Sequence, residues 1–203
     1  MPEDLNSITG NLKEEIARKG IHLGTGILMA VLYALFERNV LVFIHLFFLV
    51  GIWLVELMRV KGAIKVPFLR DRERKVVGAH AFFMLSTFIS ILVFDMRIAI
   101  ASILMLTIGD PASGAAQLCK RDAFGSIGSR EAVLKPPGVM LIMFLVSFLV
   151  GYLTLCSMRI AICGALGAAV ADGLQLKVRD VFIDDNLTIP LYAGLFMSLA
   201  SLW

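Results

Sequence analysis

The sequence predicts an all-α, polytopic integral membrane protein, a helical bundle of about seven transmembrane helices with its N-terminus in the cytoplasm. Three observations lead to this fold class. Hydrophobic residues make up 59% of the 203 residues and charged residues only 17%, and the mean hydropathy is +0.86. The apolar residues gather into separate stretches, and the basic residues gather between them on alternate sides. The chain therefore needs lipid as its solvent.

Seven apolar stretches are the predicted spans. A bilayer core of roughly 30 Å requires about 20 apolar residues in a helix, and several stretches are short, so six or eight spans stay open. We find no internal repeat and no linker, and therefore expect a single transmembrane domain over residues 1–203. The stretches cover residues 23–37, 39–58, 79–95, 97–118, 138–157, 159–175 and 188–203.

The positions of the basic residues predict the orientation. Of the 19 Lys and Arg residues, only Arg38, Arg97 and Arg159 lie on one side of the predicted membrane, each in a tight turn. The positive-inside rule places the other side, with the N-terminus and the longer loops, in the cytoplasm. Since functional residues favour longer loops, we expect an active site at the cytoplasmic face. The net charge of +3 is too small to indicate a nucleic-acid partner.

Polar residues cluster where the first stretch enters the membrane. Glu15, Arg18, Lys19 and His22 are spaced i, i+3, i+4 and i+7, which places them on one face of a helix. An alternative is an interfacial helical turn, in which Glu15 pairs with Lys19 and the basic residues contact anionic headgroups.

Two carboxylates end apolar stretches. Asp110 lies between Gly109 and Gly114, and these glycines allow another chain or a phosphate to approach the backbone. Asp172 repeats the situation at the end of the sixth stretch. An ionisable residue in a membrane helix is costly and is a functional candidate by default. Two carboxylates at one depth can share Mg²⁺ with the phosphates of a nucleotide, unless each pairs with a nearby cation.

Two connecting segments contain further candidates. Between the fourth and fifth stretches, glycines alternate with Lys and Arg, a pattern that suits phosphate binding but that also occurs in a plain basic loop. No Walker A motif is present. Before the last stretch, Asn186 and Thr188 could cap a helix with Pro190 in its first turn, but capping does not account for the adjacent acids Asp184 and Asp185.

Other polar and small residues receive simpler interpretations. Glu56 is expected to pair with Arg59 or to face a water-filled pocket, and His45 to be a packed histidine outside any mechanism. Small residues between Gly164 and Ala169 would let the sixth span pack tightly against a neighbour, and a homodimer is left open.

Taken together, four patches resemble the CTP-dependent lipid kinase family, which includes dolichol and polyprenol kinases, the yeast-type CTP-dependent diacylglycerol kinase and phytol kinase. The chain departs from the family pattern twice. The patch Lys135-Pro136-Pro137-Gly138 lacks the family's glutamate, and Asp172 is present where a glutamate is more usual. The patches occur in the family's order and extend from residue 15 to residue 190: Glu15-x-x-Arg18-Lys19-x-x-His22; Gly109-Asp110-x-Ala112-x-x-x-Ala116 with Gly125 and Gly128; Lys135-Pro136-Pro137-Gly138; and Asp185-Asn186-Leu187-Thr188-Ile189-Pro190.

The resemblance implies transfer of the terminal phosphoryl group of CTP to the hydroxyl of a membrane lipid alcohol, with Mg²⁺ as cofactor. It implies that Asp110, Asp172 or His22 accepts the hydroxyl proton. The implied metal ligands are Asp110, Asp172, Asp185 and Glu15. The implied nucleotide-binding residues are Arg18, Lys19, Gly109, Gly114, Lys120, Gly125, Gly128, Lys135, Asp185 and Asn186.

Competing functions lack their expected signatures. A cytidylyltransferase that makes a CDP-lipid should carry Gly-His-Gly-Gly and Asp-Arg-x-Asp motifs, and neither is present. A transporter should show inverted repeats with broken helices, which we do not find. An inactive scaffold of the same fold also stays open, because the third patch is altered.

Overall fold

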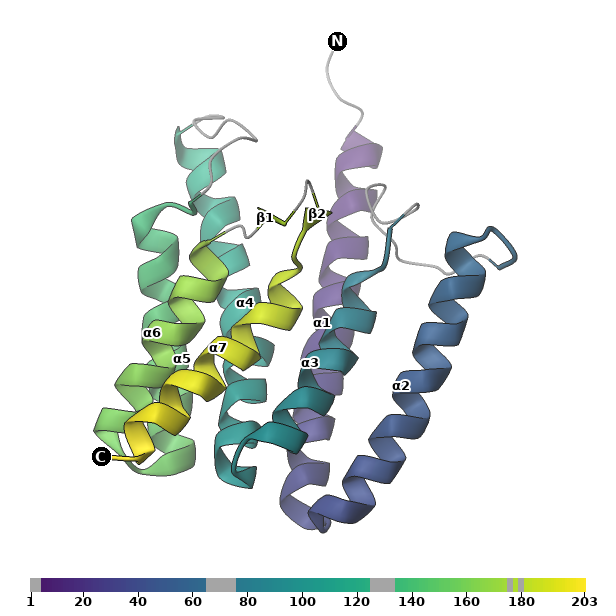
Figure 1. Cartoon of the computed structure of the whole chain (residues 1–203). Helices are drawn as coiled ribbons and strands as arrows, with labels where there is room; N and C mark the ends of the chain where they lie inside the picture. Colours follow the sequence, from purple (N-terminus) through teal and green to yellow (C-terminus); the bar gives the residue numbers. More distant parts are fainter. Residues whose placement is uncertain (1–4, 65–75, 125–133, 175–176, 179–180) are drawn as a thin grey trace.

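The chain folds into a bundle of α-helices (Figure 1). The computed structural model describes residues 5–64, 76–124, 134–174, 177–178 and 181–203. A short antiparallel hairpin, in which Lys177 pairs with Phe182, connects α6 to α7. In the described residues the elements are α1 (Leu5–Leu35), α2 (Arg38–Val60), α3 (Ala79–Val93), α4 (Met96–Phe124), α5 (Pro137–Leu155), α6 (Met158–Gly173), β1 (Lys177–Val178), β2 (Val181–Phe182) and α7 (Asp185–Ser201). Each predicted apolar stretch corresponds to one helix, so the all-α prediction is confirmed.

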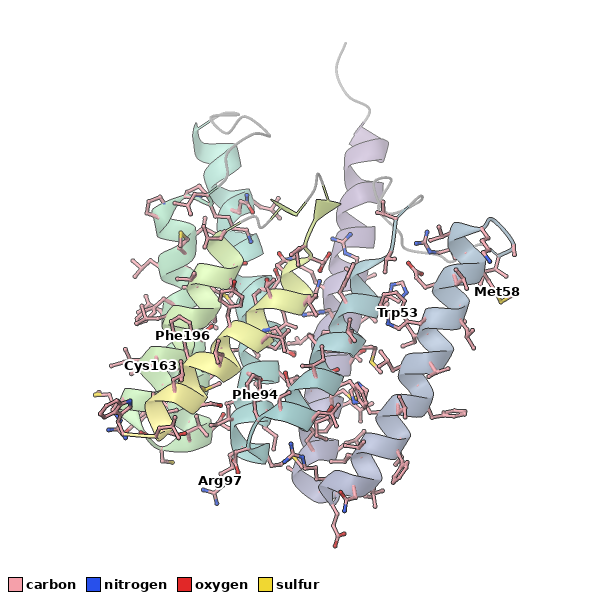
Figure 2. The ribbon with its side chains drawn as sticks, in the orientation of Figure 1. Trp53, Met58, Phe94, Arg97, Cys163 and Phe196 are labelled. Carbon is pink, nitrogen blue, oxygen red and sulfur yellow. The ribbon has the colours of Figure 1, made fainter. Side chains whose placement is uncertain are left out.

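Successive helices run in opposite directions, and the two termini lie at opposite ends of the bundle (Figure 1). Two-residue turns join α1 to α2, α3 to α4 and α5 to α6 at one end. Arg97 marks this end in Figure 2. The longer connections lie at the other end, together with the start of α1 and the β hairpin. Residues far apart in sequence can therefore meet at the end with the longer connections.

Three of the described helices are long and apolar enough to cross a membrane: α2, the Met96–Leu118 part of α4, and α5. The apolar helix α3 is shorter, with 15 residues. Large apolar side chains on α2 are strongly exposed, with Phe43 at 74% and Phe47 at 76%. Such a surface is compatible with a lipid environment, as expected for a membrane protein.

The core lies between α7 and the helices around it. Helix α7 packs against α3, α4 and α6, and Met105 of α4, Met143 of α5 and Met197 of α7 are fully buried in one core cluster. A Cβ on Gly167 of α6 would lie 2.7 Å from the backbone oxygen of Tyr192 in α7, so the two helices are in close contact here. The small residues of α6 therefore pack against a helix of the same chain, and they provide no argument for a second copy.

Phe94 in the turn between α3 and α4 fixes the other side of α7. Its ring lies against Gly194, where a Cβ would overlap the ring. Figure 2 labels Phe94 in the lower half of the view, above Arg97. A residue larger than glycine would push the ring out of this contact. Helix α7 is thus held by backbone contact with α6 on one side and by an aromatic ring on the other.

Two buried polar groups attach α2 to its neighbours. In the first, His45 Nδ1 lies 2.7 Å from the hydroxyl of Tyr33, and Nε2 lies 3.1 Å from both the Thr87 hydroxyl and the Met84 carbonyl. His45 is therefore a packed histidine, as predicted, with several hydrogen-bond partners. Such bonds stabilise helix association where apolar contact alone provides little driving force.

The second polar group lies near the C-terminal end of α2. Glu56 accepts hydrogen bonds from Arg59 Nε at 2.8 Å and Nη2 at 2.5 Å, and also from the backbone N–H of Gly78. Arg59 also donates to the Val76 carbonyl at 2.6 Å. The predicted pairing of Glu56 with Arg59 is confirmed, and it connects α2 to the start of α3.

Candidate functional site

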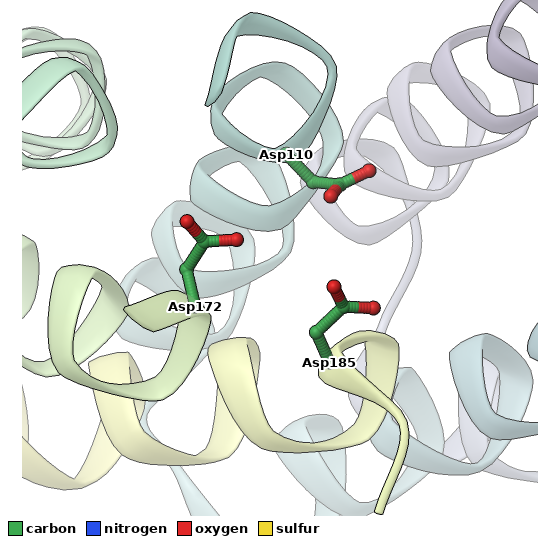
Figure 3. Close-up of side chains that lie close together, drawn as sticks. All are labelled: Asp110, Asp172 and Asp185. Carbon is green, nitrogen blue, oxygen red and sulfur yellow. The ribbon is translucent and has the colours of Figure 1, made fainter. Parts of the chain in front are cut away.

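Three carboxylates from three helices meet at the end of the bundle with the longer connections. Asp110 comes from α4, Asp172 from the last turn of α6, and Asp185 from the first turn of α7. One carboxylate oxygen of each lies within 4.8 Å of the others. Figure 3 shows the three side chains directed toward one another. We call this group the acid cluster.

The start of α7 positions Asp185. The preceding residue, Asp184, is the N-cap, and its Oδ1 accepts hydrogen bonds from the backbone N–H of Asn186 at 3.0 Å and from its Nδ2 at 2.6 Å. Asn186 was a candidate cap, but it is instead the partner of the cap. This arrangement accounts for both adjacent acids, because Asp184 caps the helix and Asp185 joins the acid cluster. The Asp185 carboxylate also benefits from the positive end of the helix dipole.

Asp172 is in a less favourable position. It lies at the C-terminal end of α6, where the helix dipole disfavours a negative charge, and its side chain is fully buried. Its Oδ1 accepts hydrogen bonds from Lys135 Nζ at 2.6 Å and from the Ser113 hydroxyl at 3.3 Å. Its Oδ2 has no hydrogen-bond partner among the described residues. A buried carboxylate oxygen without a partner is costly, so Asp172 favours a further cation or donor.

Lys135 supplies one positive charge. Its backbone N–H donates to the carbonyl of Gly173 at 3.0 Å, so the residue also closes the C-terminal end of α6. Its Nζ lies 3.8 Å from Asp185 Oδ2 in addition to its contact with Asp172. Burial by itself lowers the pKa of Lys135, but the charges of Asp172 and Asp185 outweigh burial, and the pKa lies above its ordinary value. Lys135 is therefore an ammonium ion at neutral pH.

Lys19 supplies a second positive charge from α1. Helices α1 and α4 are so close that a Cβ on Gly26 would overlap the Thr107 side chain. One end of the same interface brings Lys19 Nζ against Gly114, where a Cβ would overlap it. Gly114 lies one helical turn beyond Asp110, which places the Lys19 ammonium next to the acid cluster.

His22 lies one turn further along α1, between the two contacts with α4. Its ring meets the edge of Phe83 with the centroids 5.0 Å apart, and it interacts with the backbone carbonyl of Leu106. Its Nε2 is buried and has no hydrogen-bond partner among the described residues. In the neutral tautomer that carries its proton on Nδ1, Nε2 is a free acceptor.

The structure separates the predicted site residues into groups. Lys19, Asp110, Gly114, Lys135, Asp172 and Asp185 meet, and half-buried Arg18 lies beside Lys19 on α1. Gly109 points to α5 instead, where a Cβ would lie 2.6 Å from Met143 Sδ, so it serves helix packing. Gly125, Gly128 and the side chains of Glu15 and Lys120 lie outside the described residues.

The roles of two residues at the site were not identified from the sequence. The hydroxyl of Ser113 bridges the Asp172 carboxylate and, at 3.2 Å, the backbone carbonyl of Asp110. The signal that could have found it is its position three residues after Asp110, which places both on one helix face. Asp184 is the other, and an acid immediately before a predicted helix is a typical N-cap.

The acid cluster fits a hard divalent cation. Mg²⁺ binds carboxylate oxygens at about 2.1 Å, so two ligands on opposite sides are about 4.2 Å apart. The observed limit of 4.8 Å needs only a small closure by rotation of the side chains. The unpartnered Asp172 Oδ2 supplies an independent indication, because a buried lone pair is free to bind a cation.

Comparison of the chain with protein-family models, curated proteins and solved structures finds no match. The site is therefore classified by its own chemistry. Three convergent carboxylates with two ammonium groups at the end of a membrane helix bundle are suited to binding a phosphate group together with a divalent cation.

Proposed function

We propose that this protein is a CTP-dependent lipid kinase, which transfers the terminal phosphoryl group of CTP to the hydroxyl of a membrane lipid alcohol. The observation that carries the proposal is the convergence of Asp110, Asp172 and Asp185 with Lys19 and Lys135. Phosphoryl transfer asks a protein mainly for positioning and charge neutralisation, and these groups provide both. The resemblance of the sequence patches to this kinase family supplies the choice of CTP.

The proposal includes a topology. The seven helices all span the membrane, the N-terminus is cytoplasmic, and the acid cluster faces the cytoplasm. Support comes from the positive-inside rule, because Arg38, Arg97 and Arg159 are the basic residues that, in the described part of the chain, belong to the end with the short turns. The acid cluster belongs to the end where CTP is available.

The residues have distinct roles in the proposed reaction. The three carboxylates hold Mg²⁺, which neutralises charge on the phosphate oxygens. Lys19 and Lys135 bind phosphate oxygens directly as charge-assisted donors. The lipid hydroxyl oxygen forms a bond to the γ-phosphorus while the bond from that phosphorus to the β–γ bridging oxygen breaks, which leaves CDP.

The hydroxyl proton needs an acceptor near the acid cluster. His22 Nε2 is buried and without a partner among the described residues, which suits this role. A carboxylate of the acid cluster is the alternative acceptor. In either case the lipid hydroxyl lies at headgroup level while its hydrocarbon tail stays in the bilayer, so the substrate never has to leave the membrane.

The test is transfer of label from CTP to lipid. Detergent-purified protein is incubated with Mg²⁺, CTP labelled on the γ-phosphate, and a panel of polyprenol, diacylglycerol, isoprenoid glycerol and phytol. We expect label in one lipid, and we expect Asp110→Asn to lower the rate at least about a hundredfold, as for loss of a group that stabilises the transition state. No labelled lipid with either CTP or ATP would overturn the proposal.

A matched control makes the Asp110 result specific. Asp95 is exposed at the opposite end of α4, where its Oδ1 accepts a hydrogen bond from the Arg97 backbone at 3.0 Å. Asn caps a helix as well as Asp, so Asp95→Asn should fold and retain full activity. CTP labelled on the α-phosphate tests the alternative, because label in lipid from that position, with release of pyrophosphate, indicates a cytidylyltransferase.

A further inference from the structure

The ammonium of Lys135 lies against two of the three carboxylates of the acid cluster. Its Nζ lies 2.6 Å from Asp172 Oδ1 and 3.8 Å from Asp185 Oδ2, and the side chain is only 11% exposed. These two carboxylates belong to the acid cluster that fits a cation. An ammonium and a divalent cation repel each other strongly in such a buried place, so both cannot use the same oxygens.

We propose that Lys135 is an exchangeable counter-ion of the acid cluster. Without a divalent cation, its ammonium is the counter-ion that lies 2.6 Å from Asp172 Oδ1 and 3.8 Å from Asp185 Oδ2. When a divalent cation binds, the ammonium leaves these carboxylates and becomes available to the phosphates of the nucleotide. The nucleotide half of this exchange rests on the proposed function, whereas the cation half rests on the geometry of the acid cluster.

The charges of the site call for such an exchange. Three carboxylates face two ammonium groups, those of Lys135 and Lys19. The Asp172 carboxylate is fully buried and keeps one oxygen without a partner among the described residues. The two lysines therefore offset part of the negative charge but do not saturate the carboxylates. A divalent cation can bind Asp172 Oδ2, the oxygen without a partner, together with the neighbouring carboxylates.

The backbone around Lys135 allows the side chain to move by itself. The backbone N–H of Lys135 donates a hydrogen bond to the Gly173 carbonyl at 3.0 Å, and Leu134 forms an isolated antiparallel β-bridge with Leu174. Pro136 and Pro137 follow, and each has a restricted φ angle. The residue is therefore anchored, while the four-carbon stem of the lysine can rotate and carry the charge to a new partner.

The test measures binding of Mn²⁺ alone, without nucleotide or lipid, to the full chain in detergent. Mn²⁺ replaces Mg²⁺ because its binding is followed directly by electron paramagnetic resonance. We expect Lys135→Met to bind Mn²⁺ more tightly than the wild type, by roughly 5- to 150-fold, the usual range for two coupled ligands. In the presence of saturating Mn²⁺, the same variant should bind CTP more weakly. Exposed Lys61→Met is the matched control and should change neither affinity.

The outcomes separate this proposal from the proposed function. Equal or weaker Mn²⁺ binding by Lys135→Met would overturn the exchange and leave the metal site intact. No Mn²⁺ binding by the wild type or by Lys135→Met would overturn the metal site and the proposed function with it.

A second measurement covers the case in which Lys135→Met is unstable without metal. Thermal unfolding is followed in EDTA and in Mn²⁺ for both proteins. The exchange predicts that Mn²⁺ raises the melting temperature of Lys135→Met more than that of the wild type, because the cation replaces the missing ammonium. An equal rise in the two proteins would contradict it.

Discussion

Replacing Gly114 by Ala should impair the site while leaving the fold as stable as before. A Cβ at this position would overlap Lys19 Nζ, and the next nearest atom is the adjacent carbon of the same lysine at 3.6 Å. The obstacle is thus the far end of a flexible side chain, which can swing away. Alanine also favours a helix interior over glycine by about 1 kcal/mol. Moving the Lys19 ammonium away from the acid cluster costs about 1 kcal/mol or less, so the two terms nearly cancel.

The loss appears in catalysis because the ammonium of Lys19 no longer lies next to Asp110. A charge-assisted hydrogen bond to a phosphate contributes about 1.5–3 kcal/mol. We therefore expect kcat/KM for CTP to fall about 10- to 150-fold. Stability is measured by unfolding in mixed micelles of increasing SDS content, and kcat/KM by label transfer to lipid.

Gly167→Ala is the matched comparison for Gly114→Ala. Its Cβ would meet the Tyr192 carbonyl oxygen at 2.7 Å and the Ala193 Cα at 3.2 Å, which are backbone atoms of α7. The helices must separate, at a cost of about 1–3 kcal/mol of unfolding free energy. If Gly114→Ala lost as much stability as Gly167→Ala, the reasoning from the flexible lysine would be wrong. An unchanged kcat/KM of Gly114→Ala would show that Lys19 does not contribute to the reaction.

Two further predictions concern the polar groups that attach α2. Glu56→Gln removes the carboxylate to which the buried Arg59 donates hydrogen bonds. It should lower the unfolding free energy in mixed micelles by about 3 kcal/mol, the lower end for a broken buried pair. A loss under about 1 kcal/mol would mean that the pair is solvated. His45→Ala removes hydrogen bonds to Tyr33 and Thr87 and leaves a cavity. The substitution should lower the unfolding free energy by about 2–3 kcal/mol and leave the turnover per folded molecule unchanged. Lost turnover in folded protein would show that His45 takes part in the reaction.

Hydropathy predicted the helices but not their full lengths. Inside a bilayer every backbone group must be hydrogen-bonded within the helix, so an apolar stretch is nearly sufficient to identify one. Helix α1 begins at Leu5, well before its apolar stretch, and α4 continues to Phe124, beyond the end of its own. These extensions are polar, and their hydropathy does not distinguish a helix from a loop. The extension of α1 carries Lys19, so it matters for the site.

The sequence predicted those site residues whose burial in a membrane helix is costly in free energy. Asp110 and Asp172 were identified because a carboxylate in an apolar helix needs a reason. Asp185 came from the resemblance of its patch to a known family. The roles of Gly109 and Gly114 could not be told apart, since one faces α5 and the other Lys19. That difference depends on which helix packs on each side, and no local pattern contains it.

The ends of the helices explain why the acid cluster is asymmetric. Asp185 lies in the first turn of α7, where the helix dipole stabilises a carboxylate, and its side chain is 39% exposed. Asp172 lies in the last turn of α6, where the dipole opposes its charge, and its side chain is fully buried. The cation requirement of the cluster is therefore concentrated on Asp172. Lys135 stabilises this helix end in two ways. Its ammonium donates a hydrogen bond to Asp172 Oδ1, and its backbone N–H donates one to the carbonyl of Gly173.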